Sequence, residues 1–459
     1  MFKNLMIIGI LATIILTAGT IDLNNLDNYA NQSIPAYIQK DNTPAANPIT
    51  DAGATLGRVL FYDKKMSANG TTACASCHRQ QFAFGDTAVQ SLGLNAGVTG
   101  RHSMRLINSR FAEEFRFFWD ERATSLEDQT TRPIQDHVEM GFSGTLGDPD
   151  LDSLIRKLNK VSYYPRLFEF VYGDTIITEA RIQNALAQFV RSIQSFDSKY
   201  DIGRAAAPNG NAPFNNFTAS ENAGKALFLA PPPAGAGCDG CHRAPEFDID
   251  SASRNNGIIG IAGGGAGTDL TNTRAPSLRD LFNPAGTLNG PLFHTGGFNN
   301  IQNVINHYNQ VPQAPGNTNL DPRLQGPGAN LNLTAQEKVD LEAFLRTLTG
   351  SNVYTDPKWS DPFDAGGNIN VVLVSTAIKF TQSLEVTVYP NPTLNLVRVN
   401  LPSGDYQINL LTINGQVLKN LQFNGADYVD LMEYQSGTYL LEIIDLQTKQ
   451  RVVKKVIKQ

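Results

Sequence analysis

The sequence predicts two mainly α-helical domains in succession, followed by a small all-β module. Residues 51–205 and 217–350 carry apolar side chains at helical spacing, whereas residues 380–459 alternate apolar and polar side chains as β-strands do. A stretch rich in Ala, Pro, Asn and Gly separates the two helical domains between residues 205 and 216. We expect residues 351–379 to be a linker, and residues 21–50 to be an extended lead-in to the first domain.

Helix signals support both helical domains. In the first, the segment 178–196 places six apolar residues on one face: Ile182, Leu186, Phe189, Val190, Ile193 and Phe196. The second opens with a capping box, Thr218 with Glu221, in which each side chain bonds the other's backbone amide. It closes with another, Thr334 with Glu337, ahead of a helix that ends before Gly350.

The C-terminal 80 residues predict a β-sandwich without chemistry of its own. Strand-like runs are expected at residues 397–401, 408–413, 439–444 and 452–457, after a proline-rich turn at residues 389–393. This module contains neither Cys nor His, so it offers no metal ligand or thiol nucleophile of those types.

The N-terminus has the layout of a secretory signal peptide over residues 1–20. Lys3 precedes an apolar run from Leu5 to Leu16, and the small residues Ala18 and Gly19 follow. A membrane anchor is the alternative, although the run is short for a bilayer span. We therefore expect an exported protein located in the periplasm, on the cell surface or in the medium.

The charge balance argues against nucleic acid as a partner. The 459 residues contain 37 Lys and Arg against 43 Asp and Glu, a net charge of −6 that is spread along the chain. A nucleic-acid-binding protein would be expected to concentrate basic residues on one stretch or face.

Two copies of the motif Cys-X-X-Cys-His use every cysteine of the chain, at Cys74, Cys77 and His78 and again at Cys238, Cys241 and His242. This pentapeptide is typical of c-type haem attachment, in which both thiols bind the porphyrin covalently and the histidine ligates the iron. A disulfide or half of a zinc site would also use the thiols, but it gives no reason for the fixed histidine. The motifs predict two covalently bound haem c groups in two cytochrome c-like helical domains, with His78 and His242 as iron ligands.

The remaining iron ligands make the two haems unequal. No methionine lies between residues 141 and 431, so the second haem has no Met ligand in its own domain. His294, His307, Tyr308 or an open position remain for its iron. The choice matters because a sixth protein ligand favours electron transfer and an open position favours catalysis.

One polar and aromatic segment of the first domain carries the candidate chemistry. Trp119 is one of two tryptophans, and an indole between two haems would relay an electron. Glu139 would serve as a general acid and base beside an open haem. The structural alternatives are an ordinary core tryptophan and a carboxylate on a helix surface.

Taken in order, residues 50–350 resemble the bacterial dihaem cytochrome c peroxidase family, which includes the MauG-type proteins. The resemblance covers both haem motifs, Phe118 to Arg122, Gln129, Pro133 to Gln135, Glu139 to Gly141, Ala275 to Arg279 and Pro291 to Gly296.

The resemblance implies an enzyme that reduces hydrogen peroxide to water with electrons from a small redox protein. It implies that His78 belongs to the peroxidatic haem and His242 to the haem that receives electrons. Trp119 corresponds to the tryptophan between the haems, Glu139 to the distal acid and base, and Gln129 to its pocket partner.

The sequence departs from the family at two ligand positions. Leu94 stands where many members have a histidine that caps the peroxidatic iron, so we expect an open iron that needs no reductive activation. His102 is the residue that would otherwise supply a ligand there. Tyr308 stands at the family's Met position, as in MauG-type proteins, and is therefore expected to ligate the second haem, with His307 next to test.

The resemblance also raises structural calcium as a candidate ligand between the domains. The corresponding positions are His102, where the family usually has Asn, the side chain of Asn289 and the carbonyl of Pro291. Calcium prefers oxygen ligands, so the histidine argues against it and Asn289 argues for it.

Residues 380–459 resemble the C-terminal sorting domain of the type IX secretion system. The cues are Tyr389-Pro-Asn-Pro, Ile413-Asn-Gly-Gln416, Gly437-Thr-Tyr-Leu and the terminal Lys-Val-Ile-Lys-Gln. A sandwich that binds carbohydrate or protein is the alternative. The resemblance implies the type IX machinery as a partner.

Three functions remain open from the sequence. The first is a cytochrome c peroxidase, and the second is a MauG-like oxidant that modifies a protein or a small molecule. The third is a dihaem electron carrier without catalysis, which would need a protein ligand on both sides of each iron. A homodimer is an open alternative to a monomer.

Overall fold

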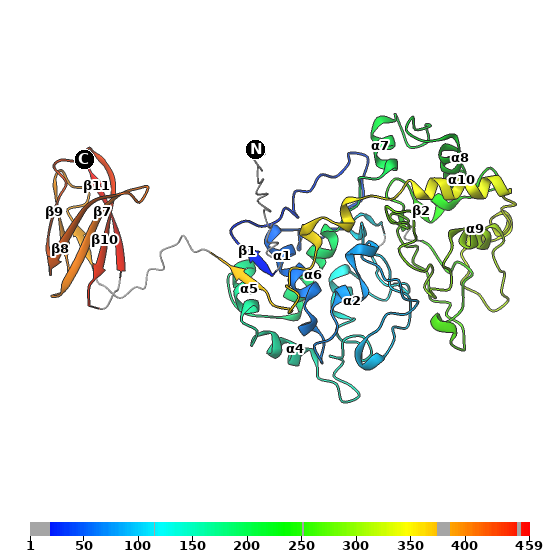
Figure 1. Ribbon diagram of the computed structural model, residues 1–459, viewed down its shortest axis with the longest axis horizontal. Helices are drawn as coiled ribbons and strands as arrows, with labels where there is room; N and C mark the ends of the chain where they lie inside the picture. Colours follow the sequence, from blue (N-terminus) through cyan, green and yellow to red (C-terminus); the bar gives the residue numbers. More distant parts are fainter. Residues whose placement is uncertain (1–18, 114, 250–251, 374–385, 448–450) are drawn as a thin grey trace, which may run out of the picture. The chain divides into compact units, whose positions relative to one another are not determined.

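Figure 1 shows the computed structural model of the chain, which describes residues 19–113, 115–249, 252–373, 386–447 and 451–459. The chain divides into two compact units, residues 1–373 and 374–459. All but the last two residues of the predicted signal peptide lie outside the described residues.

The first unit consists of two halves, each built on one packed helix pair. In the first half α1 (Asp51–Tyr62) packs against α6 (Glu179–Ser192), and in the second α8 (Ala219–Leu229) packs against α10 (Ala335–Arg346). The helix predicted over residues 178–196 is α6. Both predicted capping boxes are present, at the N-termini of α8 and α10.

A glycine sits where the helices of each pair cross. A side chain at Gly57 of α1 would overlap the backbone carbonyl of Ala185 in α6. A side chain at Gly224 of α8 would likewise overlap the carbonyl of Asp340 in α10. The absence of a Cβ therefore lets the two backbones of each pair approach closely, which is a packing use of glycine.

The rest of the first unit is less helical than the sequence suggested. The other helices are short: α2 (Cys74–Cys77), α3 (Leu126–Thr131), α4 (Leu151–Leu158), α5 (Tyr163–Tyr172), α7 (Lys199–Ala206) and α9 (Ile301–Asn309). Between α8 and α9 the described residues form loops, 3-10 turns and the short strands β2 (His242–Arg243) and β3 (Asp248–Ile249). The description "mainly α" is therefore not confirmed, because glycine, proline and asparagine in this stretch favour turns.

The segment expected to be a linker packs instead on the first half. Val353, Trp359 and Phe363 belong to the same hydrophobic core as α1 and α6. Strand β4 (Asn370–Val372) pairs in parallel with β1 (Thr20–Asp22). The periodicity of apolar residues does not predict the packing of such a segment, because its isolated aromatic residues are buried only by contacts with distant parts of the chain. Residues 374–379 of the expected linker lie outside the described residues.

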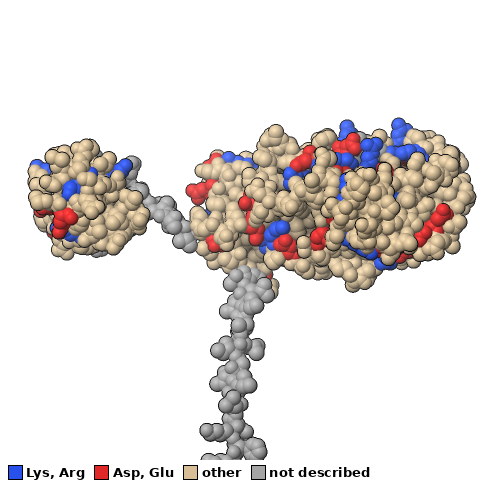
Figure 2. All heavy atoms as spheres, turned by 90° about the horizontal axis from the view of Figure 1, so that it is seen from above, with Lys and Arg blue, Asp and Glu red and all other residues tan. Residues whose placement is uncertain are grey.

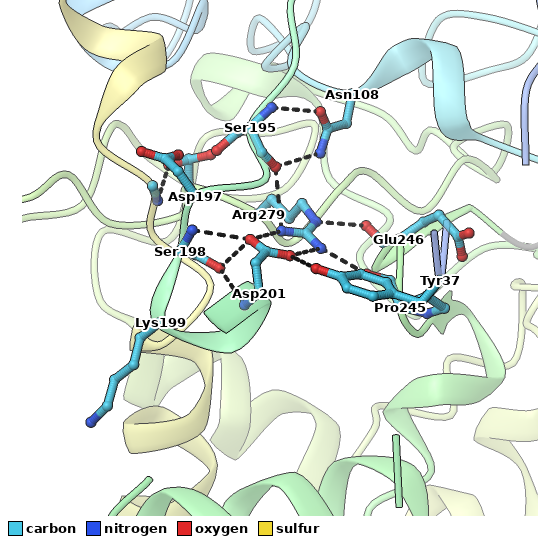
Figure 3. A network of polar contacts seen from close by, with 12 residues as sticks. Tyr37, Asn108, Ser195, Asp197, Ser198, Lys199, Asp201, Pro245, Glu246 and Arg279 are labelled. Atoms are coloured by element: carbon cyan, nitrogen blue, oxygen red, sulfur yellow. Dashed lines mark hydrogen bonds and ion pairs between the residues drawn. The ribbon is translucent and has the colours of Figure 1, made fainter. Parts of the chain in front are cut away.

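A buried ion pair joins the two halves of the first unit (Figure 3). Both terminal nitrogens of Arg279 donate to the Asp201 carboxylate of α7 at 2.9 Å, and the Arg279 side chain is fully buried. The same guanidinium donates to the carbonyl of Ser195 in the first half and to that of Pro245 in the second. Tyr37 of the lead-in completes the network by donating to Asp201 at 2.8 Å.

The second unit is a two-sheet β-sandwich. One sheet has the order β11-β10-β7-β8 and the other β5-β6-β9, with an apolar core of residues from both sheets. The strands are β5 (Thr387–Tyr389), β6 (Leu396–Asn400), β7 (Asp405–Thr412), β8 (Val417–Asn424), β9 (Asp427–Asp430), β10 (Gly437–Asp445) and β11 (Arg451–Lys458). All four predicted strand runs overlap observed strands.

Charges of both signs are interspersed on the described surface in the view of Figure 2. This distribution agrees with a net charge of −6 that is spread along the chain. It gives no support to a nucleic-acid partner.

The glycine at the crossing of α8 and α10 leads to a stability prediction. We expect Gly224→Ala to lower the free energy of unfolding by about 1–3 kcal/mol, because the added methyl forces the helices apart. Urea denaturation measures the change. Gly316→Ala is the matched control, since a Cβ there would meet no atom within 4 Å and should leave stability nearly unchanged. Equal stability of the two variants would contradict the close-packing argument.

Candidate haem sites

The first Cys-X-X-Cys-His motif lies on the wall of a cavity of about 490 Å³. The single turn of α2 carries Cys74 and Cys77, three residues apart, and ends at His78. Nδ1 of His78 lies 3.1 Å from the carbonyl oxygen of Phe84. An Nδ1–H donated to that carbonyl leaves Nε2 with the lone pair that a metal needs.

The second motif lines a larger cavity of about 600 Å³. Cys238 begins a 3-10 turn, Cys241 ends it, and His242 starts strand β2. Burial lowers the pKa of His242 to about 4, with smaller contributions from the charges of Arg323 and Arg105. The imidazole is therefore neutral at physiological pH, which is the form that ligates iron.

Both cavities fit a c-type haem. Each offers two thiols and one imidazole to a space within the ordinary size range for cofactor sites. All four cysteines are free thiols, so neither motif forms a disulfide. Within the described ranges, no group of three His, Cys, Asp or Glu side chains is arranged to hold a metal ion. The zinc alternative therefore has no complete ligand set there.

Trp119 lines both cavities. Its indole Nε1 donates to the carbonyl oxygen of His102 at 2.7 Å, and its ring meets that of His294 edge to face at 6.2 Å between centroids. Its own carbonyl accepts from the backbone of Thr273 at 2.9 Å, in the second half. The tryptophan is therefore fixed between the two candidate haem sites and is not an ordinary core residue.

Glu139 and Gln129 line the first cavity together with the haem motif. Burial, helped by the negative charge of Asp136 and opposed by Arg122, raises the pKa of Glu139 to about 7. The Asp136 carboxylate accepts from the backbone amide of Glu139 at 3.0 Å, which fixes the turn. Glu139 is not on a helix surface, as the alternative required. It is a cavity carboxyl that titrates near neutral pH.

Leu94 lies outside the lining of the first cavity. Its side chain is buried against Gly141, where a Cβ would overlap it. Its backbone amide donates to the carbonyl of Val138 at 2.7 Å. His102 lines both cavities, and its Nδ1 lies 2.9 Å from the carbonyl oxygen of Ala88.

On the second cavity, only one of the three candidate ligands from the sequence lies on the wall. Tyr308 of α9 lines the cavity, and its phenol oxygen accepts from Asn256 at 3.3 Å. Burial raises the pKa of this phenol above its usual value. Nε2 of His307 lies 2.8 Å from the Asn256 carbonyl, Nε2 of His294 lies 3.0 Å from that of Gly260, and neither residue is part of the lining.

Two of the three candidate calcium positions, His102 and Pro291, line the second cavity. His102 offers a nitrogen, which calcium does not prefer. The Asn289 amide nitrogen donates to the Asp280 carbonyl and the Tyr354 hydroxyl, although its oxygen has no hydrogen-bond partner. Asn289 does not line this cavity. Calcium binding at these positions therefore stays a prediction.

Several residues where the cavities meet carry little recognisable signal in the sequence. Met104, Arg105 and Arg274 line both cavities, as His102 and Trp119 do. The available signal was weak: Arg105 is a single charge between Met104 and the apolar pair Leu106 and Ile107. Only the fold shows that this segment runs between the two sites.

Two thiol-lined cavities that share Trp119 on their walls are the arrangement expected of a two-haem c-type cytochrome. The family described as di-haem cytochrome c peroxidase matches residues 51–206, and the secretion system C-terminal sorting domain matches residues 387–459. The chain belongs to the di-haem cytochrome c peroxidase and MauG family, and it is an exported protein with a sorting domain. Among the described residues, no helix is both long and apolar enough to span a bilayer.

Relatives of both kinds support the assignment. Methylamine utilization protein MauG of Methylophilus methylotrophus is 30% identical over 357 residues, which cover 76% of this chain and 96% of that protein. Cytochrome c551 peroxidase of Nitrosomonas europaea is 25% identical over 325 residues, which cover 67% of this chain and 82% of that protein. The solved structure of a MauG-like protein associated with microbial copper homeostasis aligns with a TM-score of 0.58 at 28% identity. The alignment covers 72% of this chain and 99% of that one.

The two motifs predict separable haem attachment. We expect the double variant Cys238→Ala/Cys241→Ala to retain one covalently bound haem, because its second cavity has no thiols to hold the porphyrin. Intact mass and a pyridine haemochrome assay count the haems. The reciprocal variant Cys74→Ala/Cys77→Ala should also retain one. Two covalent haems in either variant would contradict the assignment.

Proposed function

We propose that the protein is a peroxidase that reduces hydrogen peroxide to water at the first haem site. The observation that carries the proposal is Glu139, a carboxyl with a pKa of about 7 on the wall of the cavity that also holds Cys74, Cys77 and His78. A group that titrates near neutral pH both accepts and returns a proton efficiently.

The haem iron supplies the redox chemistry when it is bound. Glu139 takes a proton from the incoming peroxide and delivers it to the leaving oxygen, so that the O–O bond breaks with release of water. Gln129 is proposed to orient the peroxide by hydrogen bonding. With Leu94 packed away from the cavity, no capping side chain comes from that position.

The second site is proposed to receive the electrons. Each turnover consumes one peroxide, two protons and two electrons, and it produces two waters. A small redox protein would deliver the electrons one at a time to the His242 haem, and Trp119 lies between that site and the first. The second unit is proposed to direct export through the type IX machinery.

A MauG-like oxidant is the second candidate function. The observation that favours it is Tyr308, the only one of the three candidate ligands on the wall of the second cavity. A phenolate ligand stabilises ferric iron relative to ferrous iron. That preference suits long-lived oxidised states better than rapid acceptance of donor electrons.

The experiment adds hydrogen peroxide to the purified diferric protein and then assays turnover with a reduced cytochrome. We expect a high-spin resting signal from the first haem and rapid turnover. A long-lived oxidised spectrum with little turnover would favour the MauG-like function. If the protein does not react, or if both haems are low-spin, only the function of an electron carrier remains.

Glu139 predicts the pH dependence of the same reaction. Because its pKa is raised to about 7, the carboxylate fraction increases with pH, so the rate of reaction with peroxide should rise through that range. Glu139→Gln should slow the reaction by about 10²–10⁴-fold and remove this dependence.

Asp136→Asn is the matched variant for that measurement. Its amide oxygen can still accept the backbone bonds of the turn, but the negative charge that raises the pKa of Glu139 is lost. The midpoint of the pH profile should therefore move to lower pH. An unmoved profile in both variants would exclude Glu139 as the titrating group.

Tyr308 predicts the spectrum of the second haem. We expect Tyr308→Phe to change that spectrum and to raise the reduction potential of the haem, because loss of a phenolate removes a ligand that favours ferric iron. Redox titration followed by absorbance measures both. His307→Gln is the control and should change neither. An unchanged spectrum in Tyr308→Phe would rule out the tyrosine ligand.

A further inference from the structure

The boundary between the two cavities contains the positive charge of Arg105, which has no ion-pair partner among the described residues. Arg105 lines both cavities, and its one hydrogen bond within the described residues runs from Nη2 to the carbonyl oxygen of Ser277 at 2.9 Å. Its Nε is buried and has no partner. Arg105 is in none of the ion pairs among the described residues. Burial lowers the pKa of its guanidinium, and the charges of Tyr354 and Asp280 oppose this only at longer range.

Three of the other arginines on the cavity walls differ in this respect. Arg254, which lines the second cavity, also forms no ion pair among the described residues, but it is exposed to solvent. Arg101 is paired with Asp120 and Asp269, at 2.7 and 2.8 Å. Arg122 is also paired with Asp120, and Arg323 is paired with Asp321 at 2.8 Å. The charges of these three side chains are thus compensated by the protein.

The fold makes room for Arg105 at this place. A side chain at Gly85 would come within 2.9 Å of Cγ of Arg105, so the glycine leaves a passage for the aliphatic stem. Gly85 directly follows Phe84, whose carbonyl faces Nδ1 of His78. The stem of Arg105 thus passes the loop that orients the first histidine, and its charge also acts on His242.

A desolvated guanidinium costs several kcal/mol unless an anion accompanies it. Haem c carries two propionate carboxylates, and guanidinium groups bind carboxylates with parallel hydrogen bonds. We propose that Arg105 is the counter-cation for a propionate of the haem in the second cavity and thereby raises the reduction potential of that haem. The inference rests on the presence of two haems and not on peroxide as the substrate.

The physical consequence is a shift in the redox equilibrium. Reduction adds one electron to the haem, so a nearby positive charge favours the ferrous form. Without that charge the negative charge of the propionate is not compensated, and the ferric form becomes more stable relative to the ferrous form. The propionate is also no longer held ionised, so it takes up a proton when the haem is reduced.

The test is a spectroelectrochemical titration of Arg105→Met between pH 5 and 8, without peroxide. At the wild-type midpoint we expect the ferric-to-ferrous ratio of the second haem to rise about tenfold, which corresponds to about 59 mV for one electron. The midpoint should also become pH-dependent and rise as the pH falls. The reduction step that is absent from the titration of the Cys238→Ala/Cys241→Ala variant belongs to the second haem.

Two further variants separate this role from a structural one. Arg110→Met removes the same charge from an arginine that pairs with Asp41 and lines neither cavity, so its midpoint should not move. Arg105→Lys keeps the charge and should restore most of the potential and its pH independence, including where Arg105→Met fails to fold.

Three results would overturn the proposal: unchanged midpoints in Arg105→Met with both haems attached, an equal shift in Arg110→Met, or a shift confined to the first haem. The proposal would also be contradicted if Arg105→Lys lowered the reduction potential of the second haem as much as Arg105→Met does. None of these readouts depends on turnover with peroxide. Failure of the peroxidase proposal would therefore leave the result standing.

Discussion

The first unit depends on the buried pair between Arg279 and Asp201. Its bidentate geometry satisfies both charges where water has no access, and the remaining donors of the guanidinium reach carbonyls of both halves. Removal of one partner would leave a buried charge uncompensated, which is among the most costly changes in a protein interior. Through the carbonyl of Ser195 the paired guanidinium also links the end of α6 to the second half.

The boundary between the cavities serves three purposes at once. Trp119 stands between the two sites, and its hydrogen bond to the His102 carbonyl fixes the plane of the indole. Arg105 brings a buried guanidinium to the same boundary, and its Nε has no hydrogen-bond partner. The segment after His102 thus contributes to both sites although it contains no residue of either haem motif. The proposed electron transfer, the proposed contact with a haem propionate and the contact between the halves therefore involve the same few residues.

Much of the site could be predicted from the sequence because its signals are local. The haem motifs, the capping boxes at Thr218 and Thr334 and the alternating strands of the second unit each depend on neighbours within a few residues. The helical content was overestimated, since the loops that follow α8 are shaped by turn residues and by contacts distant in sequence. The packing of Trp359 into the first core left no periodic signal either.

The sequence by itself determined the chemistry of attachment, because covalent haem binding needs its thiols and histidine at a fixed short spacing. It also showed that the second domain has no methionine of its own, although the fold brings Met104 of the first half to the wall of the second cavity. Only the tertiary structure decided which side chains face the cavities. It placed Tyr308 on the wall with His294 and His307 elsewhere, and it raised the pKa of Glu139 to about 7. Both results arise from burial and from contacts between distant segments, which no local pattern encodes.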